Sequence, residues 1–228
     1  MTFSRSFFRA AAVCSMLSAV TTLGLIFLPQ WYAPGDGLAA RMARVCDPAY
    51  GLRAWIYLVH PFLTLTAGLA IAVRVRAVAP ARALVGGLGF VLWGFTEALQ
   101  QTWTLFAFDA WRRAYLEGDA ALRAQMPVQV AVYDGLWNAM YVLLLIGFAV
   151  GNLLLGLVLV RHAHFTRVIG LFLLGAAALT LHYLSGEVGG PTLAGAPDMW
   201  IEAALQPAGR VLIGVWLWRA ARETEALP

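Results

Sequence analysis

The longest apolar run in the chain lies between Trp137 and Val160, and it constrains the fold more than any other stretch. A helix needs about 20 predominantly apolar residues to cross a hydrocarbon core roughly 30 Å thick, and this run exceeds that length. Its polar residues are few: Asn138 lies near the start and Asn152 further in, with Asp134 one turn before Asn138. Polar groups are costly in lipid and should therefore face protein or water. The run predicts a membrane-spanning helix that belongs to a bundle.

The composition of the whole chain supports this interpretation. Of the 228 residues, 61% are hydrophobic and only 12% are charged, whereas about 25% of residues are charged in soluble domains. The mean hydropathy is +0.73. Because the apolar runs are joined by short loops, no room is left for a separate soluble domain. We expect residues 1–228 to form one transmembrane domain.

Five further apolar runs complete the prediction of an all-α polytopic transmembrane helix bundle. The six expected spans are about residues 7–29, 54–73, 83–108, 134–160, 168–185 and 199–218. The first run is too long for a signal peptide, and no cleavage site follows it promptly, so we retain it as a span. In the loop after it, residues 37–45 are expected to form a short amphipathic helix.

The distribution of arginine predicts the orientation of the bundle, since all 16 basic residues are arginine. Nine of them lie on the side of the N-terminus and six on the other side, and the loops on the first side are the shorter ones. Short cytoplasmic loops carry an excess of positive charge. We therefore expect both termini in the cytoplasm. A chain rich in alanine and free of lysine is typical of a GC-rich bacterial genome, which favours the bacterial inner membrane.

Two classes of function are disfavoured by the same arginines. A chain without lysine has no Schiff base, which excludes retinal photochemistry and covalent catalysis by lysine. The pI of about 9.4 does not indicate nucleic acid as a partner, because the arginines lie mainly at helix ends, where they set the topology. The lipid bilayer is the expected partner.

Ionisable and amide side chains from several spans are expected to reach the membrane interior. Such residues mark functional sites by default, and together they predict a polar cavity open to the outer face. The predicted ligand-binding residues are Glu97, Gln101, Asp134, Asn138, Glu202, Gln206 and Arg210.

The last span carries the clearest part of this pattern. Glu202, Gln206 and Arg210 are spaced by four residues and therefore lie on one helix face. A deeply placed arginine needs a carboxylate, because an unpaired guanidinium in a low dielectric costs several kcal/mol. Glu97 is the predicted partner of Arg210, and Asp134 or Glu202 is the alternative. Such a pair has two interpretations, a ligand or ion site and a contact that only fixes which helices are neighbours.

Two histidines extend the chemistry that the cavity is able to support. His60 and His182, each expected within a span, would ligate a metal ion together with the carboxylates, or serve as axial ligands of a haem. No HExxH motif and no pair of histidines within one helix accompanies them. A hydrogen bond to a neighbouring helix is the alternative for each histidine.

Gly147 and Gly151 form a small-xxx-small pair in the fourth expected span. Such a pair lets two helix backbones approach closely. The pair has two interpretations, packing inside the bundle and self-association into a homo-oligomer.

The order of these features resembles a family of prokaryotic polytopic membrane proteins, domain of unknown function 4386. The similar segments are WGFTEALQQ with Glu97, YDGLWNAMY with Asp134, GFAVGNLLLG, RVIGLFLLGAAA and QPAGRVLIGVWLWR with Arg210. The resemblance covers most of the chain and implies a six-span membrane protein. The family has no established activity to carry over, so the resemblance leaves the function open.

Three functional hypotheses follow. The first is a protein that binds a small polar or amphipathic ligand or ion in an outward-facing cavity, as in a transporter or sensor. The second is a membrane-embedded enzyme that uses histidines and carboxylates as acid, base or metal ligands. The third is an accessory subunit whose polar residues only specify helix pairing.

Overall fold

The computed structural model describes residues 4–32, 35–190 and 197–223, and in the last range it describes side chains from residue 203 onward. The described part of the chain is almost entirely helical and contains no strand. Its elements, in chain order, are α1 (Arg5–Phe27), η1 (Leu28–Gln30), α2 (Gly37–Ala43), η2 (Arg44–Cys46), α3 (Pro48–Val75), α4 (Pro80–Trp103), the π-helical turn η3 (Thr104–Phe108), α5 (Asp109–Glu117), α6 (Ala120–Leu159), α7 (His164–Glu187) and α8 (Pro197–Glu223).

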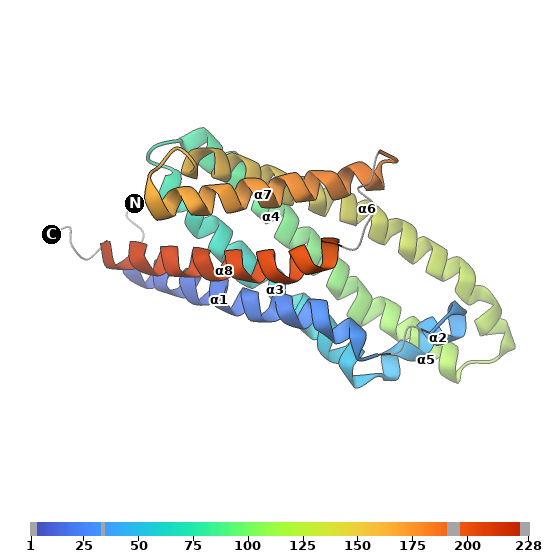
Figure 1. Cartoon of the computed structure of the whole chain (residues 1–228). Coiled ribbons are helices and arrows are strands. Elements are labelled where there is room, and N and C mark those ends of the chain that lie inside the picture. The colour runs from blue at the N-terminus through green and yellow to red at the C-terminus, as the bar shows by residue number, and fades with distance from the viewer. Residues whose placement is uncertain (1–3, 33–34, 191–196, 224–228) are drawn as a thin grey trace.

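The six long helices form a ring, with both termini at the same end of the bundle (Figure 1). Starting from α8, each helix packs on the next in the order α1, α3, α4, α6 and α7. The ring closes only sparsely between α7 and α8. There Phe172 lies on the backbone of Gly209, and a Cβ atom on Gly209 would be 1.9 Å from Phe172 Cε2. The fold therefore surrounds a central space with helices.

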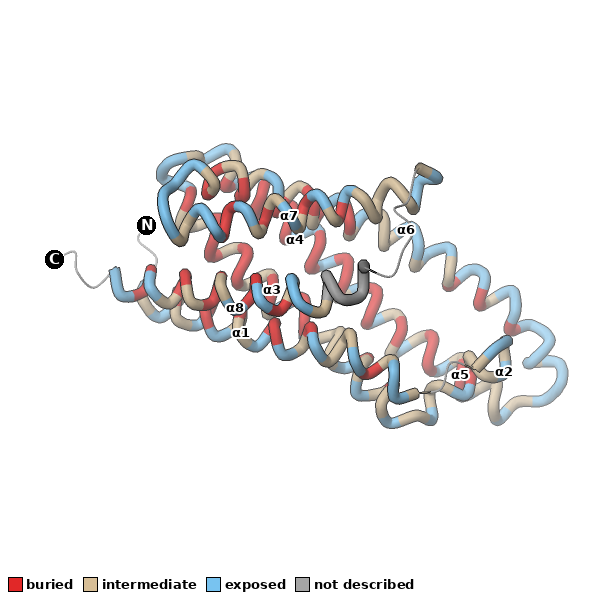
Figure 2. The backbone as a smooth tube through the Cα atoms, in the orientation of Figure 1, coloured by how far each residue is buried: buried red, intermediate tan, exposed pale blue. Residues whose placement is uncertain are grey.

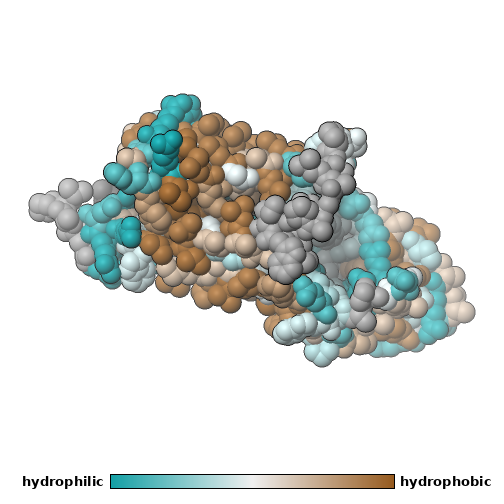
Figure 3. Space-filling view, in the orientation of Figure 1, coloured by the Kyte–Doolittle hydropathy of each residue, from teal (hydrophilic) through white to brown (hydrophobic). Residues whose placement is uncertain are grey.

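Five helical segments are long and apolar enough to cross a membrane, among the described residues. Their outward faces carry large apolar side chains such as Val20, Leu84 and Phe95, which are 64%, 65% and 67% exposed. Buried residues lie on the inward faces (Figure 2), and on the side shown in Figure 3 an apolar belt separates two polar ends. Soluble monomers rarely expose apolar surface on this scale. These features are those of a multi-pass membrane protein.

Local sequence signals determine where several helices begin. Asp47 caps α3 by accepting hydrogen bonds from the backbone N–H groups of Ala49 and Tyr50, at 2.8 and 3.3 Å. Asp119 caps α6 through the N–H of Leu122 at 2.9 Å. A side-chain oxygen at the N-cap satisfies N–H groups that have no partner within the helix. Both helices therefore begin well before the apolar runs that they contain.

For this reason the helix that contains the fourth expected span starts well before that span. The helix begins at Ala120 rather than near Asp134 and has 40 residues, which at 1.5 Å per residue makes it about 60 Å long. This is about twice the thickness of a hydrocarbon core. The first part of α6 extends beyond the apolar belt, and Asp134 is a mid-helix residue.

The segment after the third expected span is helical. The π-helical turn η3 joins α4 to α5, and α5 packs with α2 and the start of α6. Arg112 and Asp109 form a buried ion pair of 2.8 Å, and Arg112 lies 4.5 Å from the ring centroid of Phe108. A second small core, separate from that of the ring, forms at this end. The short helix α2 agrees with the prediction for residues 37–45.

Gly147 and Gly151 of α6 pack against α4 of the same chain. A Cβ atom on Gly147 would lie 2.8 Å from Gly89 O and Trp93 N, and one on Gly89 would lie 2.8 Å from Gly147 O. The backbones of α4 and α6 are therefore in direct contact at these positions. This contact agrees with packing inside the bundle, and self-association through Gly147 and Gly151 stays a prediction.

Candidate functional site

A cavity of about 450 Å³ lies at the centre of the ring, with lining residues from all six long helices. This volume is within the range of small-molecule sites, about 300–1,000 Å³. Toward the end remote from the termini, its lining residues Ile26, Arg53 and Tyr57 are partly exposed, whereas Ser15 and Asn152 deeper in are buried. The described lining residues are therefore most buried in the middle of the bundle and less buried toward the end that carries α2 and α5.

Arg210 of α8 lies in the deep part of this cavity and is only 8% exposed. Its Nη1 donates a hydrogen bond of 3.4 Å to Ser18 Oγ of α1 and another to Thr64 Oγ1 of α3. Ser15 Oγ donates to the backbone oxygen of Arg210 at 2.7 Å. Hydroxyl groups on two neighbouring helices thus fix the guanidinium at the inner wall.

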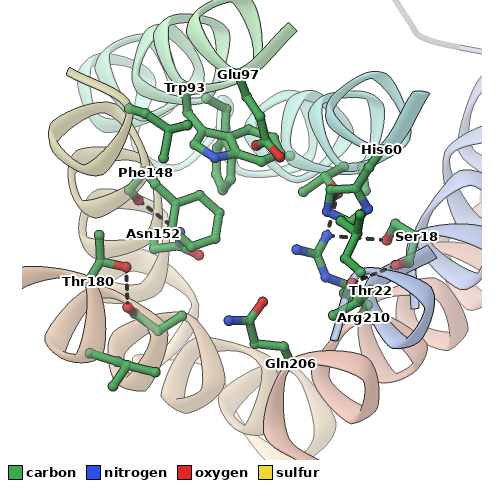
Figure 4. A pocket seen from close by; sticks show the side chains of 18 of the residues that line it. Ser18, Thr22, His60, Trp93, Glu97, Phe148, Asn152, Thr180, Gln206 and Arg210 are labelled. Carbon is green, nitrogen blue, oxygen red and sulfur yellow. Dashed lines mark hydrogen bonds between the residues drawn. The ribbon is translucent and has the colours of Figure 1, made fainter. Parts of the chain in front are cut away.

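Glu97 of α4 lines the same cavity from another side (Figure 4). It is 6% exposed, and no hydrogen bond joins its carboxylate to a described residue. The ion pairs among the described side chains are Arg41–Asp134, Arg74–Glu223 and Arg112–Asp109. Glu97 and Arg210 interact electrostatically, as expected of charge partners, but they form no direct ion pair. The physical reason is that Ser18 and Thr64 hold the guanidinium on the side of α1 and α3, away from α4.

Aromatic rings line the cavity next to Glu97. Trp93 lies one helical turn before Glu97 on α4, and its ring centroid is 5.3 Å from that of Phe148 on α6. Phe90 packs edge-on against both rings, at 6.4 and 5.9 Å. The Glu97 carboxylate thus lies beside aromatic rings that line the same cavity.

Amide and hydroxyl groups occupy the side formed by the last helices. Asn152 Nδ2 donates to Phe148 O at 2.8 Å, and Thr180 Oγ1 donates to Ala176 O at 2.7 Å. Gln206 of α8 extends into the open space at the centre of the view in Figure 4. The cavity therefore offers neutral polar groups as well as one cation and one anion in its deep part.

His60 lies at the cavity beside the kink-prone Pro61 and is 4% exposed. Its Nδ1 is 2.7 Å from Thr21 Oγ1, and its Nε2 is 3.4 Å from Thr64 Oγ1. Both ring nitrogens thus have hydroxyl partners on α1 and α3. This is the neighbour-bonded alternative that the sequence left open for this histidine.

The structure divides the predicted site residues into two groups. Glu97, Gln206, Arg210 and His60 line the cavity. The others, Gln101, Asp134, Asn138 and His182, do not line it, and the side chain of Glu202 lies outside the described part. Gln101 is buried and Asn138 is exposed, while His182 packs against Tyr183 with ring centroids 5.8 Å apart.

The metal and haem hypotheses stay predictions. Among the described side chains there is no group of three or more His, Cys, Asp or Glu residues placed to hold a metal ion. His60 lines the cavity and His182 does not.

Asp134 is engaged away from the cavity, with Arg41 of α2. Arg41 donates to both carboxylate oxygens, with 2.8 Å from Nη1 to Oδ2. This hydrogen bond raises the pKa of Arg41 above its ordinary value. The pair joins the helical segment before α3 to the projecting part of α6, so Asp134 has a structural partner rather than a place in the central site.

The contribution of this pair to stability is expected to be small. The two side chains are 31% and 42% exposed, and pairs with this exposure contribute about 0.2–1 kcal/mol. The Asp134→Asn variant should lower the melting temperature by no more than about 4 °C, as measured by thermal unfolding of the detergent-purified protein. The exposed Glu117→Gln variant is the control. A loss of folding in Asp134→Asn alone would contradict this assignment.

Several lining residues gave no usable signal in the sequence. Ser18, Thr64 and Thr180 are small hydroxyl residues within apolar helices, where such residues usually bond to their own backbone. In the sequence, Trp93 and Phe148 cannot be distinguished from other apolar residues of the expected spans. Asn152 was visible as a polar group deep in the fourth span and was the one missed residue with a clear signal.

Comparisons with family models, with curated proteins and with solved structures found no match to this chain. The resemblance to domain of unknown function 4386 therefore stays a prediction.

Proposed function

We propose that the chain binds a small polar or amphipathic ligand in the central cavity, as a multi-pass protein of the bacterial inner membrane. In this proposal α8 is the sixth span, and both termini lie in the cytoplasm. The cavity then opens to the outer face. A transporter or a sensor is the kind of protein that uses such a site.

One observation carries the proposal. Arg210 and Glu97 both lie in the deep part of one cavity and are almost fully buried, yet they do not pair with each other. Buried charges are costly unless they are paired. A residue pair kept only to align helices would be expected to close into a direct contact. Two separated charges around a cavity of about 450 Å³ are instead suited to a bound guest.

Binding is tested with the purified full chain in lipid nanodiscs. A panel of small charged and polar metabolites is screened by thermal shift, because a ligand that binds only the folded state raises the melting temperature in proportion to log concentration. At least one compound is expected to do so. If no compound does so and none is retained in equilibrium dialysis, the proposal is wrong.

The proposed orientation is tested with a native cysteine. Cys46 is exposed beyond the end of α1, and Cys14 lies within α1. With cytoplasmic termini, Cys46 faces the periplasm. A membrane-impermeant maleimide should label the Cys14→Ser variant in intact cells and should leave the Cys46→Ser variant unlabelled. Labelling of Cys14→Ser only after cell lysis would reverse the orientation.

A further inference from the structure

We infer that the ligand is a small zwitterion, which binds with its anionic group at Arg210 and its ammonium group at Glu97. This inference rests on the proposed function and narrows its ligand class. The term covers a free aqueous zwitterion, such as an amino acid or a betaine, and the zwitterionic headgroup of a phospholipid.

Arg210 is the cation of the site. Arginine carries five N–H donors in a planar fork, and the hydrogen bonds from Arg210 to described residues use Nη1 alone. The guanidinium borders the open space (Figure 4). Because hydroxyl groups do not neutralise its charge, a carboxylate or phosphate of the ligand is the group that fits here.

The carboxylate of the site belongs to Glu97. Glu97 is a buried carboxylate without a hydrogen-bond partner among the described residues, and it borders the same space. Trp93 and Phe148 lie beside it. Aromatic faces attract cations, so a carboxylate set in an aromatic wall is suited to an ammonium group, including a quaternary one.

Arg210 and Glu97 border the same cavity and would contact one ligand together. The carboxylate of Glu97 is the one carboxylate that borders the cavity among the described lining residues. A ligand with a single charge would neutralise either Arg210 or Glu97 and leave the other buried charge unpaired, which is costly. A ligand with no charge would leave both unpaired. A molecule with both charges provides a partner for Arg210 and for Glu97 at the same time.

The test compares molecules that differ in charge and share a carbon chain. The soluble probes are 4-aminobutyrate, with both charges, butyrate, with the anion only, and 1-aminobutane, with the cation only. The lipid probes are dioleoyl phosphatidylethanolamine and dioleoyl phosphatidylglycerol, added to the detergent-purified protein. Thermal shift and equilibrium dialysis measure the soluble probes, and native mass spectrometry measures the retained lipids.

The expected result is a preference for the zwitterion of about tenfold or more over each single-charge analogue, since a charge-assisted hydrogen bond contributes that much. A preference among the soluble probes indicates an aqueous ligand. A preference for phosphatidylethanolamine alone indicates a lipid headgroup. In the Glu97→Gln variant the preference for the zwitterion should be lost and butyrate should bind at least as tightly as in the wild type, whereas the exposed Glu117→Gln variant should behave like the wild type.

Equal binding of butyrate and 4-aminobutyrate, together with equal retention of the two lipids, would overturn the zwitterion and leave ligand binding intact. Failure of every probe would overturn the zwitterion, and failure of the metabolite panel as well would overturn the proposed function. The wild-type comparison needs no variant, so the test holds even if Glu97→Gln fails to fold.

Discussion

The Arg210→Leu variant is expected to lose ligand binding in the cavity by about 100-fold or more, because two charge-assisted hydrogen bonds of the ligand lose their donor. Leucine is similar in bulk to the aliphatic part of arginine. Ser18 Oγ retains a hydrogen bond to Ser15 O of 2.7 Å, so α1 keeps its internal contacts. The variant should therefore fold. Binding is measured by equilibrium dialysis with the compound that gives the largest thermal shift in the wild type.

Two further variants make this prediction specific. Arg210→Lys keeps the charge and loses the planar fork, so it should retain part of the binding. Arg113→Leu makes the same change at an exposed position on α5 and should bind like the wild type. If Arg210→Leu folds and binds as tightly as the wild type, Arg210 has no role in binding. If Arg210→Leu aggregates and Arg210→Lys does not bind the ligand, the interpretation that Arg210 only fixes which helices are neighbours is favoured.

The Gly147→Leu variant is expected to be strongly destabilised. Its side chain would enter the space of Gly89 O and Trp93 N, which are backbone atoms 2.8 Å from the Cβ position. Overpacking costs about 1–3 kcal/mol where side chains yield, and here a helix backbone has to move. The melting temperature should fall by more than about 6 °C, or the protein should fail to fold.

The same substitution at another glycine provides the control. Gly175 of α7 has no atom within 4 Å of its Cβ position, so Gly175→Leu should change the melting temperature little. Size-exclusion chromatography and thermal unfolding in detergent measure both variants. A Gly147→Leu protein as stable as Gly175→Leu would mean that α4 and α6 do not approach closely.

The all-α class could be predicted from the sequence because hydropathy and run length determine it. Five of the expected apolar runs lie in helices long and apolar enough to cross a membrane. The helix ends were harder to predict, because hydropathy marks only the part of a helix that suits lipid. The cap at Asp119 begins α6 fourteen residues before Asp134, and no apolar pattern reveals this.

The candidate site was predictable only in part. Arg210 and Glu97 stood out because charged residues within apolar runs are rare. Their separation was not predictable, since it depends on hydroxyl groups of Ser18 and Thr64 that come from two other helices. The ion pair of Asp134 was not predictable either, because helix position alone does not reveal a partner such as Arg41, which lies 93 residues earlier in the chain.

The most direct test of the central claim is an experimental structure of the protein in lipid nanodiscs, at a resolution that shows side chains and bound molecules. We expect density that belongs to no protein atom between Arg210 and Glu97, with Arg210 still bonded to Ser18 and Thr64. A closed cavity with a direct ion pair between Arg210 and Glu97 would contradict the account and favour a purely structural role for both residues.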